Sequence, residues 1–246
     1  MRPMQLVTLR FDDSRPVAPD LESRLYLARL VSKVCGPFGL LAWRVRGSSL
    51  RLLLASEPRG ATEAARRVAI GAQQVIGGGS RWAPARVRPI RGVDQVARLS
   101  QQLLLTEVTS PLDTASSLPD ALGLRALAPY LRGGRALLSQ SLPFPPLSDE
   151  HSLAQEADWS QLPVAAAAVF GHANLSRRFA WRTRVLSASA SLAMPAMRLN
   201  EMSALLRVSR STLYRAIERP VPRGLKTMVE GQLRWRSLLA RQERVA

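Results

Sequence analysis

The sequence predicts an α+β protein of two domains, the first built from strands and helices and the second from helices alone. Three observations lead to this prediction. Strand-like and helical patterns alternate over residues 1–138. Residues 139–158 contain three prolines and a cluster of acidic side chains, a composition typical of a linker. Residues 159–246 show helical patterns only, so we expect two domains with the linker between them.

The elements expected in the N-terminal domain follow from the spacing of its apolar residues and from the turn residues between them. Leucines and valines recur at helical spacing in LESRLYLARLVSKV, and Gly36-Pro37 ends that run. Two apolar runs flank Arg46-Gly47-Ser48-Ser49, which predicts a β-hairpin. In chain order we expect a strand at 5–11, a helix at 21–34, strands at 40–45 and 50–55, a helix at 61–76, a strand at 86–90 and a helix at 93–106.

The C-terminal domain is expected to consist of helices, and its last helix is amphipathic. An amphipathic tail can pack back on its own domain or join a second copy of the chain, so a homodimer is one possible partner state. The expected helices cover 162–170, 176–192, 199–206, 210–219 and 224–241.

Residues 199–218 (LNEMSALLRVSRSTLYRAIE) have the spacing of a helix-turn-helix. Residues 207–209 form the predicted turn, and Ser209 is placed to cap the second helix. The turn of this motif usually holds Gly, whereas Arg207 stands here, and a non-Gly residue at positive φ is uncommon. Side chains suited to phosphate oxygens and base edges gather at the start and outward positions of the second helix, namely Ser209, Arg210, Ser211, Thr212 and Arg215.

The chain is strongly basic. Its 246 residues include 35 Lys plus Arg against 18 Asp plus Glu, a formal net charge of +17. Such a surplus favours a polyanionic partner, most often nucleic acid, and argues against an ordinary near-neutral enzyme. Because Lys33 and Lys226 are the only lysines, an Arg-rich genomic composition is the alternative explanation of the charge.

Two stretches that precede the predicted helix-turn-helix add to the helical pattern of the C-terminal domain. They are VAAAAVFGHANL (164–175), a helix followed by Phe-Gly and an extended step, and SRRFAWRTRVLSASASL (176–192), a long helix led by arginines. With Arg210-Ser211-Thr212, residues 162–220 resemble the DNA-binding domain of the replication initiator DnaA, which has His-Ser-Thr at that step. The resemblance implies that Arg210 and Thr212 enter the major groove. It also implies phosphate contacts by Arg177, Arg178, Arg182 and Arg184.

The hairpin WRVRGSSLRLLL (43–54) follows a strand and a Leu-rich helix. In this order residues 4–110 resemble the single-tyrosine HUH transposases, including the REP-associated group, which implies a ferredoxin-like fold. That family carries a metal-binding His pair on the second hairpin strand, where this chain has Ser49 and Arg51, and Gly47-Ser48 replaces its Pro-Asn turn. Arg51 stays protonated and cannot ligate a cation.

The reaction of that family needs a divalent metal at the scissile phosphate and a Tyr that attacks it. No Tyr lies between Tyr26 and Tyr130, and neither of these matches the family's position. We therefore expect no catalytic residue, no metal site and no cofactor. The sequence favours a sequence-specific DNA-binding protein derived from a transposase, without strand cleavage, that acts as a regulator, a targeting subunit or an assembly subunit.

Arginines on the predicted hairpin suggest a second contact with nucleic acid. Arg44, Arg46 and Arg51 alternate with apolar residues, which places them on one face of the sheet. On that face they can bind phosphates of a DNA hairpin or a single strand. The alternative is a polar strand face that only meets solvent.

Two other functions stay open. The chain can be a divergent nuclease or transposase that cuts DNA with a metal at Asp12, Asp13 or Glu63, although paired acids such as Asp12-Asp13 are more often a turn or a cap. It can also be a protein-interaction subunit of a larger complex, with a partner surface formed by its Ala-rich helices and its tryptophans, although a buried Trp is commoner. The tryptophans considered are Trp159, Trp181 and Trp235.

The numbers of cysteines and histidines and the lengths of the apolar runs exclude several kinds of site and segment. One cysteine, Cys35, permits neither a disulfide framework nor a thiolate metal site, and two histidines cannot make a three-His site. The first residues lack an apolar signal core, and the longest apolar run, 164–170, is too short to span a bilayer. We therefore expect no membrane partner and a cytoplasmic, nucleoid-associated protein.

Overall fold

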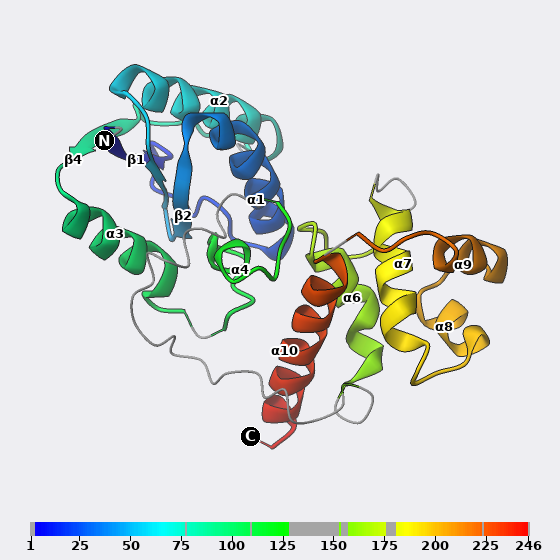
Figure 1. Cartoon of the computed structure of the whole chain (residues 1–246). Helices are drawn as coiled ribbons and strands as arrows, with labels where there is room; N and C mark the ends of the chain where they lie inside the picture. Colours follow the sequence, from blue (N-terminus) through cyan, green and yellow to red (C-terminus); the bar gives the residue numbers. More distant parts are fainter. Residues whose placement is uncertain are drawn as a thin grey trace. The chain divides into compact units, whose positions relative to one another are not determined.

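The computed structural model describes residues 3–76, 78–108, 110–127, 153, 157–175, 181–222 and 224–245. Its architecture is α+β, as the sequence predicts, and the chain divides into two compact units (Figure 1). Of the described residues, the first unit holds those up to Gly123 and Leu127. The second holds Leu124–Ala126 and those from Leu153 onward. Most of the predicted linker, 139–158, lies outside the described residues.

The first unit is built on a four-stranded antiparallel sheet in the order β2-β3-β1-β4. Its strands are β1 (Met4–Arg10), β2 (Leu40–Arg46), β3 (Ser49–Leu54) and β4 (Arg86–Ile90), close to the predicted bounds. The hairpin predicted around Gly47-Ser48 joins β2 to β3, and Gly47 has φ +50°. A two-residue hairpin turn with Gly at its first central position requires this left-handed conformation.

Two long helices cover one face of the sheet (Figure 1). They are α1 (Leu21–Cys35) and α2 (Pro58–Ile76), and a short 3-10 helix, η1 (Gly36–Phe38), follows α1. The Asp20 side chain accepts a hydrogen bond from the backbone N–H of Ser23 and so caps α1. The main core lies between these helices and the sheet, and it includes Val7, Leu9, Trp43, Leu50, Leu52 and Val68.

The opposite face of the sheet is covered at one end by α3 (Val93–Leu105) and α4 (Leu118–Ala121). A second core forms there, with Ala42, Leu53, Ile90, Val96, Leu103 and Leu118 among its buried residues. The short α4 was not predicted. Cys35, the single cysteine, is buried against the first face, and this burial raises the pKa of its thiol to about 12.

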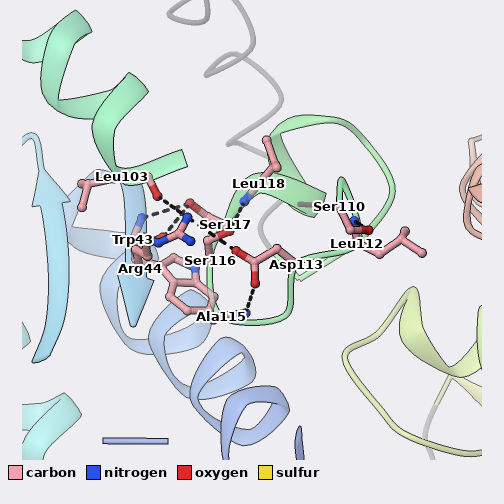
Figure 2. Close-up of polar contacts among 10 residues, drawn as sticks. All are labelled: Trp43, Arg44, Leu103, Ser110, Leu112, Asp113, Ala115, Ser116, Ser117 and Leu118. Atoms are coloured by element: carbon pink, nitrogen blue, oxygen red, sulfur yellow. Dashed lines mark hydrogen bonds and ion pairs between the residues drawn. The ribbon is translucent and has the colours of Figure 1, made fainter. Parts of the chain in front are cut away.

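The residues before α4 cover the edge strand β2, as Figure 2 shows. Ser117 donates its backbone N–H to the Trp43 carbonyl (3.0 Å), and its hydroxyl accepts the Trp43 N–H (2.9 Å). The Val45 N–H donates to the carbonyl of Ala115 (2.7 Å). These bonds satisfy backbone groups that an open sheet edge would leave unpaired.

The second unit is helical, with α6 (Leu162–Ala168), α7 (Arg182–Ala193), α8 (Leu199–Leu205), α9 (Arg210–Ile217), α10 (Leu225–Val245) and the 3-10 helix η3 (Trp159–Gln161). The helix predicted over 176–192 is described only from Trp181 onward. Its buried face is rich in Ala and Ser, which lets α6, α9 and α10 pack closely around α7. The tail helix α10 packs back into this core through Val229 and Leu233, one of the two states expected for it.

Candidate nucleic-acid interface

Helices α8 and α9 are joined by a turn with a defined hydrogen-bond pattern. The Arg207 N–H donates to the Ala204 carbonyl (3.1 Å), and the Val208 N–H donates to the Ser203 carbonyl (3.1 Å). Arg207 has φ +51°, the left-handed conformation that glycine usually supplies where a helix ends in this way. The Ser203 hydroxyl also donates to the Val208 carbonyl (2.6 Å), so a side chain fixes the turn as well.

Ser209 caps α9, as predicted. Its hydroxyl oxygen accepts the backbone N–H of Thr212 (3.2 Å) and lies 2.8 Å from the Thr212 hydroxyl and 3.0 Å from that of Ser211. Sequence reasoning assigned Ser209 and Thr212 to contacts with DNA. In the structure their hydroxyls hold the first turn of α9 in place, and Thr212 is half-buried.

The outward face of α9 is made of polar, basic and aromatic side chains. Arg210, Ser211 and Arg215 are exposed as predicted, while Leu213 and Ala216 are buried in the core. Sequence reasoning missed Tyr214, which is 56% exposed between the two arginines. Among the described residues, neither Arg210 nor Arg215 has a carboxylate partner. This face can therefore offer two guanidinium groups and a phenol to a ligand.

Of the four arginines assigned to phosphates by resemblance, Arg177 and Arg178 lie outside the described residues. Arg182 is half-buried at the start of α7. Arg184 is exposed, and its guanidinium carbon lies 4.5 Å from the centre of the Trp181 ring. Trp181 in turn stacks on Phe170 with ring centres 5.4 Å apart. Arg184 is therefore held by a cation–π contact.

The unusual turn residue gives a prediction about stability. Replacing Arg207 by Gly should raise the free energy of unfolding by about 1 kcal/mol, because Gly adopts positive φ without the steric cost that a β-carbon brings. Denaturant unfolding of the two proteins measures the difference. Arg207→Ala is the matched control, since it removes the same charge and keeps the β-carbon. Equal effects of Gly and Ala would contradict the explanation.

One prediction for the sheet is wrong. Arg44 was expected to reach phosphates from an open strand face, but it is only 8% exposed. Its guanidinium lies 3.5 Å from the Asp113 carboxylate and donates to the Leu103 carbonyl (3.3 Å), as Figure 2 shows. The segment that covers β2 brings Asp113 over this face. Arg44 therefore holds the segment in place and is not accessible to a ligand.

The other two sheet arginines remain accessible. The strand register places Arg44 directly opposite Arg51 and Arg46 opposite Ser49, so the three arginines share one face, as predicted. Arg46 is exposed and pairs with Glu107. Arg51 is half-buried, and it has no carboxylate partner among the described residues.

The residues considered for cleavage chemistry have structural partners. The Tyr26 hydroxyl donates to the Gly71 carbonyl (2.8 Å). Asp13 accepts hydrogen bonds from the Ser80 hydroxyl and the Arg15 N–H, which lower the pKa of its carboxyl. Hydrogen bonds from Arg66 and then Arg67 lower the pKa of Glu63 to about 2. Asp13 thus forms the turn contact that paired acids often make.

The tryptophans considered for a partner surface differ in exposure. Trp235 is buried, Trp159 is half-buried and Trp181 is 43% exposed. Across the part of the chain that the structure describes, no group of three or more His, Cys, Asp or Glu side chains is arranged to hold a metal ion.

Comparison of the chain with protein families, with curated proteins and with solved structures finds no match. Within the described residues, no helix combines the length and the apolar character needed to cross a membrane.

Proposed function

We propose that this protein binds duplex DNA sequence-specifically, with α8 and α9 acting as a helix-turn-helix. The observation that carries the proposal is the outward face of α9, where Arg210, Tyr214 and Arg215 are exposed on a helix whose opposite side is fixed in the core. A recognition helix needs both properties, since it must enter the major groove and keep its orientation there.

The chemistry of this face suits base edges. A guanidinium can donate two hydrogen bonds to O6 and N7 of guanine, and Arg210 and Arg215 are unpaired with any described carboxylate. The Tyr214 ring offers an apolar surface beside them, which suits a thymine methyl group. Ser211 adds a hydroxyl for a phosphate oxygen. The formal net charge of +17 supplies the sequence-independent attraction to DNA.

The experiment that tests this proposal is selection of bound duplexes from a random library by the full-length protein. An enriched motif that competes against random duplex supports the proposal. Binding with no enrichment, or no binding at physiological salt, would refute sequence-specific recognition.

We further propose that the first unit is a ferredoxin-like scaffold of the HUH-transposase type that no longer cuts DNA. The order of the elements supports this proposal. Strands and helices follow one another as βαββαβ on an antiparallel sheet, which is the arrangement of ferredoxin-like folds. Ser49 and Arg51 stand on β3 at the positions where the family has its His pair, and the Tyr26 hydroxyl on α1 donates to the Gly71 carbonyl on α2. The protein would then act as a regulator, a targeting subunit or an assembly subunit.

Loss of cleavage has its own test. Labelled single strands and hairpins incubated with the protein and Mg²⁺ or Mn²⁺ should stay intact, and no 5′-phosphotyrosine adduct should form, because Arg51 cannot ligate a cation. Gel electrophoresis would detect a cleaved strand, and mass spectrometry would detect the adduct. A nicked strand or a covalent adduct would favour the alternative of a divergent nuclease.

A further inference from the structure

Arg207 occupies a backbone position that disfavours arginine. It follows the last turn of α8 with φ +51°, in the left-handed region where a β-carbon comes too close to the following carbonyl oxygen. Glycine usually stands at such a helix end, and asparagine is the common alternative. Arginine has neither the conformational freedom of glycine nor the short polar side chain of asparagine. It therefore lowers the stability of the turn through its backbone, unless its side chain compensates within the fold.

The Arg207 side chain provides no such compensation. It is exposed, and within the described ranges it forms no hydrogen bond, ion pair or ring contact. Its backbone N–H donates to the Ala204 carbonyl (3.1 Å), a bond that glycine would make equally well. The turn is also fixed by Ser203, whose hydroxyl donates to the Val208 carbonyl (2.6 Å). The turn thus needs a left-handed residue, but nothing in the described fold needs the guanidinium group.

The place of Arg207 in the motif suits a contact with the DNA backbone. Arg207 lies two residues before Ser209, the cap of α9, and three before Arg210, the first residue of that helix. In a helix-turn-helix the first helix crosses the DNA backbone and the start of the second enters the major groove. The turn between the two helices therefore lies near the phosphates at the edge of the groove.

The hydroxyl groups at the start of α9 are less suited to this contact. The Ser209 oxygen accepts the Thr212 N–H (3.2 Å) and lies 2.8 Å from the Thr212 hydroxyl, so both groups are engaged in the cap. A phosphate at this end of the helix is better met by a side chain without internal partners. Arg207 offers one, with a planar fork of N–H donors that matches the oxygens of a phosphate.

We propose that Arg207 binds a phosphate of duplex DNA, and that this contact accounts for an arginine at a left-handed position. The inference rests on the duplex binding proposed for α8 and α9. It adds a residue that strengthens and orients binding without reading the sequence. Because hydrogen bonds within the turn hold its backbone in place, the guanidinium reaches the phosphate from a fixed point beside the start of α9.

The test compares Arg207→Gly, Arg207→Ala and Arg207→Lys in the full-length protein. Fluorescence-anisotropy titrations use the selected duplex and a scrambled duplex over a range of salt concentrations. The Gly and Ala variants should bind both duplexes roughly fivefold more weakly at physiological salt, and their salt slopes should fall by about 0.9, as expected for one phosphate contact on B-DNA. Arg207→Lys should keep the slope, because it keeps the positive charge.

Stability is the second readout, and in one variant it moves in the opposite direction to affinity. Arg207→Gly should unfold at a higher urea concentration than the parent protein, because it removes the β-carbon, while it binds DNA more weakly. Arg207→Ala should bind as weakly as Arg207→Gly without the gain in stability, since it keeps the β-carbon at positive φ. Such a pattern would assign the arginine to the ligand and not to the fold.

Two matched controls separate backbone strain from charge. Ser14→Gly removes a β-carbon at another exposed left-handed position, with φ +57°, in the first unit. It should leave the affinity and the salt slope unchanged. Arg98→Ala removes one exposed charge from α3 and should lower the slope less than Arg207→Ala does.

Parental affinity and slope in Arg207→Gly and Arg207→Ala would overturn the contact, and so would an equal loss in Arg98→Ala. A loss confined to the selected duplex would overturn the assignment to a phosphate, because Arg207 would then read a base. Failure of this contact alone is recognisable: Arg210→Ala/Arg215→Ala loses the preference for the selected duplex while the Arg207 variants bind like the parent. If the parent itself shows no preference or no binding, the proposed function fails and the Arg207 contact fails with it.

Discussion

Replacing Arg210 and Arg215 together by alanine is expected to abolish sequence-specific duplex binding, with an affinity loss of about 100-fold or more. Each two-pronged contact between Arg and guanine contributes about 1–3 kcal/mol of discrimination, and both side chains lie on the exposed face of α9. Alanine is the best helix former, so α9 itself should persist. Because the base contacts would be lost, the remaining affinity should be the same for the selected motif and for random duplex.

A mobility-shift titration with the selected duplex and a scrambled duplex measures both quantities. The matched control is Arg98→Ala/Lys226→Ala, which removes two exposed charges from α3 and α10. It should lower binding to both duplexes slightly and equally. If the control and the α9 variant lose the same affinity, net charge explains binding and α9 is not the reading helix.

The second large effect concerns the stability of the first unit. Asp113→Ala should lower the free energy of unfolding by about 3–5 kcal/mol, because it leaves the Arg44 guanidinium mostly buried without its carboxylate. The Leu103 carbonyl accepts a hydrogen bond from the Arg44 guanidinium (3.3 Å), but it does not replace the lost negative charge. Asp113 also accepts the Ala115 N–H (2.9 Å), so the substitution loosens the turn as well.

Two further variants separate these contributions in urea unfolding. Asp113→Asn keeps an acceptor for the Ala115 N–H and loses only the charge, so it isolates the ion pair. The double variant Arg44→Met/Asp113→Ala should be less destabilised than Asp113→Ala alone, since no uncompensated charge stays buried. A loss below about 0.5 kcal/mol for Asp113→Ala would show that this pair adds little to stability.

The sequence was sufficient to locate most of the fold because apolar spacing reports burial directly. The strands and long helices of the first unit, such as α1 and β4, begin and end close to their predicted bounds. The segment before α4 escaped prediction because side-chain and backbone hydrogen bonds hold it, through Ser117 and Ala115, without any apolar period. The wrong prediction for Arg44 follows from the same omission, since that segment carries Asp113.

The candidate site was harder to predict because it depends on backbone conformation and on exposure. The sequence identified Arg207 as an unusual turn residue, but only the structure shows that the described fold leaves its side chain without a partner. Tyr214 was missed because an aromatic residue within a helix is more often buried. By contrast, the Ser209 cap was predictable, since a cap depends on local sequence alone.

The path of the chain between the two units has a practical consequence for dissecting the protein. Leu124–Ala126 belong with the helices: the Leu124 carbonyl accepts the Gln232 side chain (2.9 Å), and the Ala126 N–H donates to the Val169 carbonyl (2.7 Å). The Leu124 side chain also lies against Gly231, where a β-carbon would come within 2.6 Å of it. A fragment designed to carry only the second unit therefore has to start upstream of Leu124. A fragment that starts within 139–158 would lack Leu124–Ala126 and the contacts that these residues make.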